Sequence, residues 1–165
     1  MKTLITTASR TAGALAIVAI ALSGPALAGG SNFQPVKDAA VLKECGACHM
    51  PYLAGLLPAR SWTAIMAGLK DHFGENAELD AETARRIGDY LTANAADGRD
   101  ARSKAPRGLQ QSPAPLRITE LPWWRQKHEK KGRIAPATLK RRGVKLVSDC
   151  VACHVDAARG SFDDD

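Results

Sequence analysis

The pentapeptide C-x-x-C-H occurs twice in this chain and accounts for all four of its cysteines. The copies are Cys45-Gly46-Ala47-Cys48-His49 and Cys150-Val151-Ala152-Cys153-His154. Two thiols at this spacing add to the two vinyl groups on one edge of a haem, and the next histidine then lies under the iron as its proximal ligand. The sequence therefore predicts two covalently bound c-type haems. Haem 1 is expected on Cys45 and Cys48 with His49 as ligand, and haem 2 on Cys150 and Cys153 with His154.

Three other uses of paired cysteines fit less well. A thioredoxin-like redox pair belongs in a βαβ context, and no β-rich alternating segment is visible. A zinc site does not require a histidine after each second cysteine. Disulfides between the two motifs are compatible with the composition, but they leave both histidines without a role.

Residues 1–28 have the pattern of a secretory signal peptide. Lys2 and Arg10 accompany an apolar stretch, a Gly-Pro break follows, and Ala26-Leu27-Ala28 forms an A-x-A cleavage site. A permanent membrane anchor needs about 20 apolar residues, and this run is roughly half as long. We therefore expect cleavage near Ala28, a periplasmic mature protein and no stable membrane anchor.

Length and composition narrow the possibilities further. A chain of 165 residues forms one or two small domains and is too short for a large enzyme. Aromatic residues make up 5%, which is few for a self-sufficient core, and a buried cofactor would supply the missing apolar bulk. The formal net charge is +6, but loss of the signal peptide and the charges of the haem propionates leave a holoprotein that is only slightly cationic. Nucleic acid is therefore not an expected partner.

The distal iron ligands must come from a short list. Besides the motif residues, the mature chain has two histidines, His72 and His128, and two methionines, Met50 and Met66. Met50 directly follows His49, so it lies on the proximal side of the haem. Met66 falls at the spacing of an apolar helix face and is expected in the core. We therefore predict His72 and His128 as the distal metal ligands.

The pairing of these ligands follows from loop length. Residues 155–165 contain no His, Met, Lys or Tyr, so haem 2 recruits any distal ligand from upstream. Short loops cost less entropy to close, which pairs His72 with the haem at His49 and His128 with the haem at His154. Crossed pairing stays open and would make the two halves mutually dependent.

Hydrophobic periodicity and breaker residues predict an all-α fold. The expected helices cover residues 35–44, 61–71 and 80–94, with one more running from Pro136 into the second motif. Ser61 and Asp80 are the expected N-caps of the second and third helices. Gly88 inside the third helix costs about 1 kcal/mol relative to Ala, which suggests close approach of another helix.

The organisation that follows is two small haem-binding halves. Residues 29–96 form an N-terminal haem domain, residues 97–122 a Pro-rich linker or haem-wrapping loop, and residues 123–165 a C-terminal haem segment. The C-terminal segment contains a basic cluster that is expected to be a solvated face or to steer a redox partner. This cluster consists of Arg125, Lys127, Lys130, Lys131 and Arg133.

Several longer runs extend the two motifs. They are Cys45-x-x-Cys48-His49-Met50, Gly55-Leu56-Leu57-Pro58-Ala59-Arg60-Ser61-Trp62, His72-Phe73-Gly74-Glu75-Asn76-Ala77, Arg117-Ile118-Thr119, His128 and Cys150-x-x-Cys153-His154. With these runs the chain resembles the dihaem cytochrome c family of exported bacterial electron carriers, over nearly the whole mature sequence. The resemblance implies an N-terminal half similar to class I cytochromes c, a C-terminal half with little regular structure, and a histidine on both sides of each iron.

Two haems with both axial positions filled leave no open coordination site, so we expect electron transfer between redox proteins and no enzymatic activity. The expected partners are redox proteins, with a membrane b-type cytochrome as the candidate donor and another soluble cytochrome as the candidate acceptor. Two alternatives are a ligand-binding or peroxidase-like cytochrome with one open iron and a haem subunit of a larger oxidoreductase complex.

The motif count makes a direct prediction for the purified mature protein. Its intact mass should exceed that of the polypeptide by two haems, and acid-acetone should extract neither haem, because each is held by thioether bonds. Mass spectrometry and alkylation check this. A mass with one haem, or two cysteines free to alkylate, would contradict it.

Overall fold

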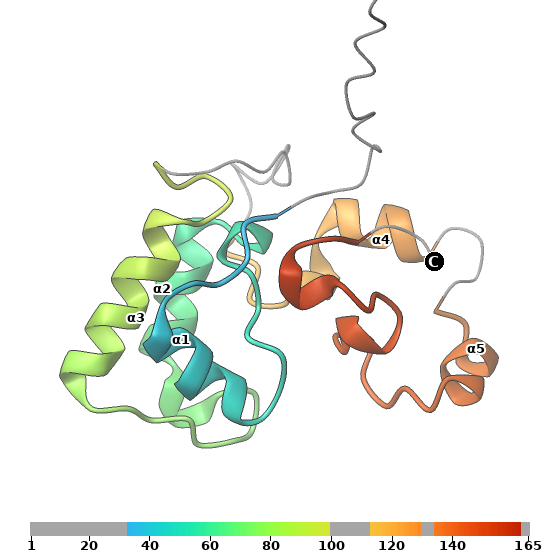
Figure 1. Cartoon of the computed structure of the whole chain (residues 1–165), viewed down its shortest axis with the longest axis horizontal. Helices are drawn as coiled ribbons and strands as arrows, with labels where there is room; N and C mark the ends of the chain where they lie inside the picture. Colours follow the sequence, from blue (N-terminus) through green and yellow to red (C-terminus); the bar gives the residue numbers. More distant parts are fainter. Residues whose placement is uncertain (1–32, 100–112, 130–133, 163–165) are drawn as a thin grey trace, which may run out of the picture.

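A computed structural model describes residues 33–99, 113–129 and 134–162 of the chain. The expected signal peptide, residues 100–112 of the predicted linker, part of the basic cluster and the last three residues lie outside the described residues. Within these ranges the chain forms helices and turns and no strand, which confirms the all-α prediction. Figure 1 shows α1, α2 and α3 gathered on one side of the molecule and α4, α5 and the second C-x-x-C-H motif on the other.

Helix α1 covers Ala39–Glu44, which corrects the predicted start at residue 35. The carboxylate of Asp38 accepts hydrogen bonds from the amides of Ala40 and Val41, at 2.8 and 3.2 Å, and so satisfies two donors of the first turn. Residues 33–38 belong to no helix. Asp38, not Pro35, therefore sets the beginning of this helix.

Helix α2 covers Ala59–Ala67 and differs from the prediction at both ends. Ser61 lies buried inside the helix and does not cap it. The amide of Ala59 instead donates to the carboxylate of Asp97, 2.6 Å away and 38 residues distant in sequence. At the other end Gly68 terminates α2, and a separate 3₁₀ turn, η3, follows at Leu69–Asp71.

Helix α3 covers Ala81–Ala93, capped by Asp80, as predicted. It packs along α2 (Figure 1), and a Cβ on Gly88 would lie 3.8 Å from Cγ of Met66. The helix predicted to approach Gly88 closely is thus α2. Met66 packs against the hydrophobic core, in agreement with its predicted role.

The described part of the C-terminal half contains two short α-helices, α4 at Pro122–His128 and α5 at Pro136–Arg141. The prediction that the helix from Pro136 continues into the second motif is wrong. Gly143 follows with φ +66°, a left-handed conformation that ends the helix. The motif itself forms a separate 3₁₀ turn, η6, at Cys150–Ala152.

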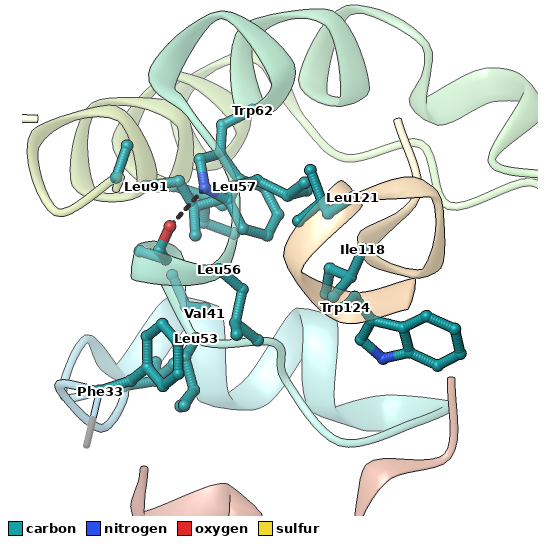
Figure 2. Close-up of a cluster of buried hydrophobic side chains, with 14 residues drawn as sticks. Phe33, Val41, Leu53, Leu56, Leu57, Trp62, Leu91, Ile118, Leu121 and Trp124 are labelled. Carbon is teal, nitrogen blue, oxygen red and sulfur yellow. Dashed lines mark hydrogen bonds between the residues drawn. The ribbon is translucent and has the colours of Figure 1, made fainter. Parts of the chain in front are cut away.

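One hydrophobic core joins residues from both halves (Figure 2). Leu53, Leu57 and Ile87 are fully buried on the N-terminal side. Leu121 and Trp124, from the end of the predicted linker and from α4, belong to the same cluster. In Figure 2 a dashed line marks the hydrogen bond from the Trp62 indole to the Ala54 carbonyl, 2.7 Å long. Ile118 and Leu121, near the end of the predicted linker, are therefore part of the hydrophobic core.

The beginning and end of the described chain meet directly. The amide of Phe33 donates to the carbonyl of Gly160 at 2.8 Å, and the Phe33 ring packs edge-on against Phe162. Gly160 has φ +90°, and a Cβ there would overlap the Phe33 carbonyl group. Only glycine fits this position without a rearrangement.

The cap of α1 provides a stability test. Asp38→Ala should lower the free energy of unfolding by about 1–2 kcal/mol, because it removes the cap of the first turn. Asp38→Asn should lower the free energy of unfolding by less than Asp38→Ala, since an amide oxygen also caps a helix. The ion pair between Asp38 and the exposed Arg86, at 3.0 Å, contributes little to stability. Denaturant unfolding of the holoprotein measures both, with Arg85→Ala as a control for loss of an exposed ion pair.

The same carboxylate predicts a pH effect. Burial would raise the pKa of Asp38, but the Arg86 guanidinium and the two amides outweigh it and lower that pKa below 3.8. The advantage of wild type over Asp38→Asn should be complete above about pH 4 and disappear as the pH falls through the lower folded-state pKa. An Asn variant as unstable as the Ala variant at neutral pH would contradict the capping role.

Candidate haem sites

The first C-x-x-C-H motif continues directly from α1. Cys45 ends that helix and begins the 3₁₀ turn η1, Cys45–Ala47, so the backbone keeps turning and exposes Cys48 and His49. Nδ1 of His49 donates to the carbonyl of Met50 at 2.7 Å. This hydrogen bond leaves Nε2 as the unprotonated nitrogen, which is the form that binds a metal.

His72 is presented by a tight turn after η3. Its amide and carbonyl pair with those of Glu75, and the two residues between them, Phe73 and Gly74, have φ of +59° and +101°. Positive φ at both central positions is typical of a type I′ hairpin turn. The Asp71 carboxylate accepts from the Gly74 amide at 3.0 Å and holds this conformation. The His72 ring faces that of His49, with ring centroids 6.3 Å apart and planes 21° apart.

The second site is assembled from α4 and η6. His128 is the last residue of α4; its Nδ1 donates to the Trp124 carbonyl at 2.8 Å, and its ring stacks on the Trp124 indole at 4.2 Å. His154 lies just after η6, where its amide donates to the Cys150 carbonyl. The ring centroids of His128 and His154 lie 6.1 Å apart, and the two ring planes are nearly perpendicular, at 86°.

The structure therefore brings the predicted residues together as two separate pairs, His49 with His72 and His128 with His154. These are the pairs that loop length favoured, and the crossed arrangement is not the one observed. All four cysteines are free, so no disulfide joins the motifs. In the described residues no three of His, Cys, Asp and Glu form a cluster that could hold a bare metal ion.

These distances fit an iron between each pair of imidazoles. A metal–imidazole bond is about 2 Å long and the ring centre lies about 1 Å behind the bonding nitrogen, so two imidazoles on opposite sides of one metal have centres about 6 Å apart. The centroid separations of both pairs, 6.3 and 6.1 Å, agree with this value. The donor set of each site is two thiols and two imidazoles. His72 would be the distal ligand of haem 1 and His128 the distal ligand of haem 2. The cysteines of each motif would form the thioether bonds, and the histidine of each motif would be the proximal ligand.

The electrostatics of the cysteines argue against a thiolate redox centre. Burial raises the pKa of the Cys150 thiol to about 11, with a further contribution from the charge of Asp149. Burial, and then the charge of Glu44, also raises the pKa of Cys45. Reactive C-x-x-C cysteines have lowered pKa values. The first thiol of each motif is thus a neutral group, unlike that of a thioredoxin-like enzyme.

His72 is held neutral by its surroundings. Burial lowers the pKa of His72, and the neighbouring His49 and Arg117 lower it further. A metal binds the neutral imidazole, and with a lowered pKa the His72 ring binds few protons at neutral pH. Protons therefore compete only weakly with a metal for this side chain.

Each of the four histidines has one aromatic neighbour that the sequence analysis did not assign to a site. These contacts are Tyr52 on His49, Phe73 on His72, Trp124 on His128 and Phe162 on His154. Trp124 lies four residues before His128 and Phe73 directly follows His72, but no periodicity marks any of these rings as part of a site.

Comparisons with known proteins agree with this arrangement. A family model described as dihaem cytochrome c matches residues 41–162. A diheme cytochrome c from Rhodobacter sphaeroides is similar at 49% identity and TM-score 0.69, over 78% of this chain and 99% of that one. A DHC structure from the same organism is 45% identical, with TM-score 0.63 over the same shares of the two chains.

A diheme cytochrome type c from Shewanella baltica OS155 is 37% identical, with TM-score 0.59 over 76% of this chain and 86% of that one. A search of curated proteins gives no match. The family match covers both motifs and both histidine pairs. The chain therefore belongs to the dihaem cytochrome c family, which implies two covalently bound c-type haems and an electron-transfer function.

Proposed function

We propose that the protein is a periplasmic carrier that passes electrons between redox proteins through two haems, each held between two histidines. The facing histidine pairs are the observation that supports this most directly. His49 and His72, and His128 and His154, lie at the separation that one bound metal requires. The haems supply reversible one-electron chemistry when they are bound.

The ligand arrangement favours a carrier over an enzyme. With an imidazole on each side, neither iron has an open position for oxygen or peroxide, whereas outer-sphere electron transfer needs no ligand to leave. Histidine in place of methionine also gives a lower reduction potential, since methionine ligation raises it. We therefore propose low potentials and no catalytic activity.

Export is part of the proposal and rests on residues 1–28, whose pattern is that of a signal peptide. In the part of the chain that the structure describes, no helix has the length and apolar character of a membrane span.

The redox partners are proposed to bind through charge. Arg125 and Lys127 are exposed on α4, three residues and one residue before His128. Further exposed cations follow on and after α5, namely Lys140, Arg141, Arg142 and Lys145. A basic surface beside the second site suits an acidic face on the donor or acceptor. A membrane b-type cytochrome as donor and a soluble cytochrome as acceptor remain the proposed partners.

Removing one distal ligand tests the ligation. His72→Ala and His128→Ala should each open one iron, give a high-spin signal and bind carbon monoxide at one haem, while the other haem stays low-spin. Wild type should show neither property. Optical and electron paramagnetic resonance spectra with and without carbon monoxide measure this, and Met66→Leu is the control that should stay low-spin. If both histidine variants stayed fully low-spin, another side chain would be the ligand; rapid carbon monoxide binding by wild type would overturn the carrier function.

The charge proposal predicts a salt-dependent reaction. The bimolecular rate of electron transfer with an acidic partner should fall as ionic strength rises, because screening weakens long-range attraction. Arg125→Glu together with Lys127→Glu should lower that rate at low salt and leave both midpoint potentials nearly unchanged. Stopped-flow kinetics measure the rate. The control is Lys70→Glu, an exposed charge in η3 of the N-terminal half. An unchanged rate in the double variant would show that the surface is not used.

A further inference from the structure

Tyr52 contacts both haem sites. It lies three residues after His49, and its ring stacks on the His49 imidazole with centroids 4.8 Å apart and planes 29° apart. Its hydroxyl donates to the carbonyl of Ser148 at 3.0 Å, across a separation of 96 residues in sequence. The side chain thus extends from the proximal ligand of the first site to the loop before the second motif.

The Ser148 carbonyl is itself part of the second site. It also accepts a hydrogen bond from the amide of Cys150, at 2.9 Å, and so fixes the turn that carries the first cysteine of the motif. A continuous series of contacts therefore runs from the His49 ring through the Tyr52 ring and hydroxyl to Ser148 and Cys150. Every step is a ring contact, a hydrogen bond or a covalent bond.

Other aromatic contacts in the described residues reach one site each. Phe33 touches Phe162, which packs on His154, but this group does not reach the first site. Arg117 lies over the Phe73 ring, which packs on His72, and this group does not reach the second motif. Tyr52 differs because one side chain contacts an iron-ligand residue of one site and the cysteine turn of the other.

We propose that Tyr52 is the positioning residue through which the two haem sites exchange electrons. The step is a one-electron exchange: one iron is oxidised and the other is reduced. No bond of Tyr52 forms or breaks, and its hydroxyl proton stays in the hydrogen bond to Ser148. This inference rests on the proposed function, because it requires two low-spin haems held by the histidine pairs.

The test compares three variants of the full-length holoprotein. Tyr52→Phe keeps the ring on His49 and removes the hydroxyl, and Tyr52→Leu removes both contacts. Tyr90→Phe is the matched control, because the Tyr90 hydroxyl also has a backbone partner, the Lys37 amide at 3.1 Å, and this bond belongs to neither site. Less than one electron per protein is introduced by a pulse of a small reductant. The absorbance of the two haems then relaxes as this electron redistributes. A relaxation rate that does not depend on protein concentration reports electron exchange between the two haems of one molecule.

We expect a several-fold slower exchange in Tyr52→Phe, a larger loss in Tyr52→Leu and no change in Tyr90→Phe. The iron–iron distance, measured by pulsed electron paramagnetic resonance, should be the same in Tyr52→Phe and wild type. The resonance of the first haem should shift in Tyr52→Leu, because the His49 ring loses its stacking partner. An unchanged rate in both Tyr52 variants would overturn the proposal. So would a slower rate accompanied by a longer iron–iron distance, since Tyr52 would then only hold the halves together.

This outcome is separable from failure of the proposed function. Optical spectra of each variant, with and without carbon monoxide, show whether both haems remain low-spin and closed. A closed, low-spin Tyr52→Phe protein with an unchanged exchange rate contradicts only the role of Tyr52. Carbon monoxide binding by wild type contradicts the carrier itself.

Discussion

The arrangement of two imidazoles facing each other across the space of one metal is the constraint on which this structure depends. Each pair takes one histidine from a cysteine motif and one from a separate segment, so both segments must be held to within a fraction of an ångström. Backbone carbonyls help to do this, because those of Met50 and Trp124 accept hydrogen bonds from Nδ1 of His49 and His128 and restrain both rings. His154 differs, because its Nδ1 is buried and has no hydrogen-bond partner in the described chain.

The small number of aromatic residues is explained by where they lie. Half of the eight aromatic side chains contact one of the four histidines, one ring for each. The aliphatic residues Leu53, Leu57, Ile87 and Leu121 fill much of the remaining core. A flat ring restrains the rotation of an imidazole better than a flexible chain does. The composition therefore reflects ligand placement as much as core formation.

Local sequence predicted those features that depend on local interactions. Helix α3 could be predicted from its N-cap, Asp80, and from the spacing of its apolar residues. The groups that interact in both features are only a few residues apart in the sequence. The start of α2 could not be predicted in the same way, since its carboxylate partner, Asp97, lies in the turn after α3, 38 residues from Ala59. Ser61 offered a plausible cap but is buried by tertiary packing.

The candidate sites show the same division. Counting the histidines was enough to identify all four candidate ligands, and loop length favoured the pairs that the structure brings together. The contact of Tyr52 with Ser148 had no local signal, because it joins two loops far apart in the chain. The likeness of the N-terminal half to class I cytochromes c stays a prediction.

The bond between Phe33 and Gly160 has a consequence for the order in which the molecule assembles. A chain is synthesised from its N-terminal end, so the Phe33 amide meets its acceptor, the Gly160 carbonyl, only after nearly every later described residue has followed. Closing so long a loop costs entropy before any contact compensates it, which makes such contacts late events in folding. The turn that carries His72 closes over four residues, whereas the ring of Phe162 on His154 is completed by the last residues to arrive. Folding of this chain thus has a direction, in which the contacts around His154 are completed after the local turn that carries His72.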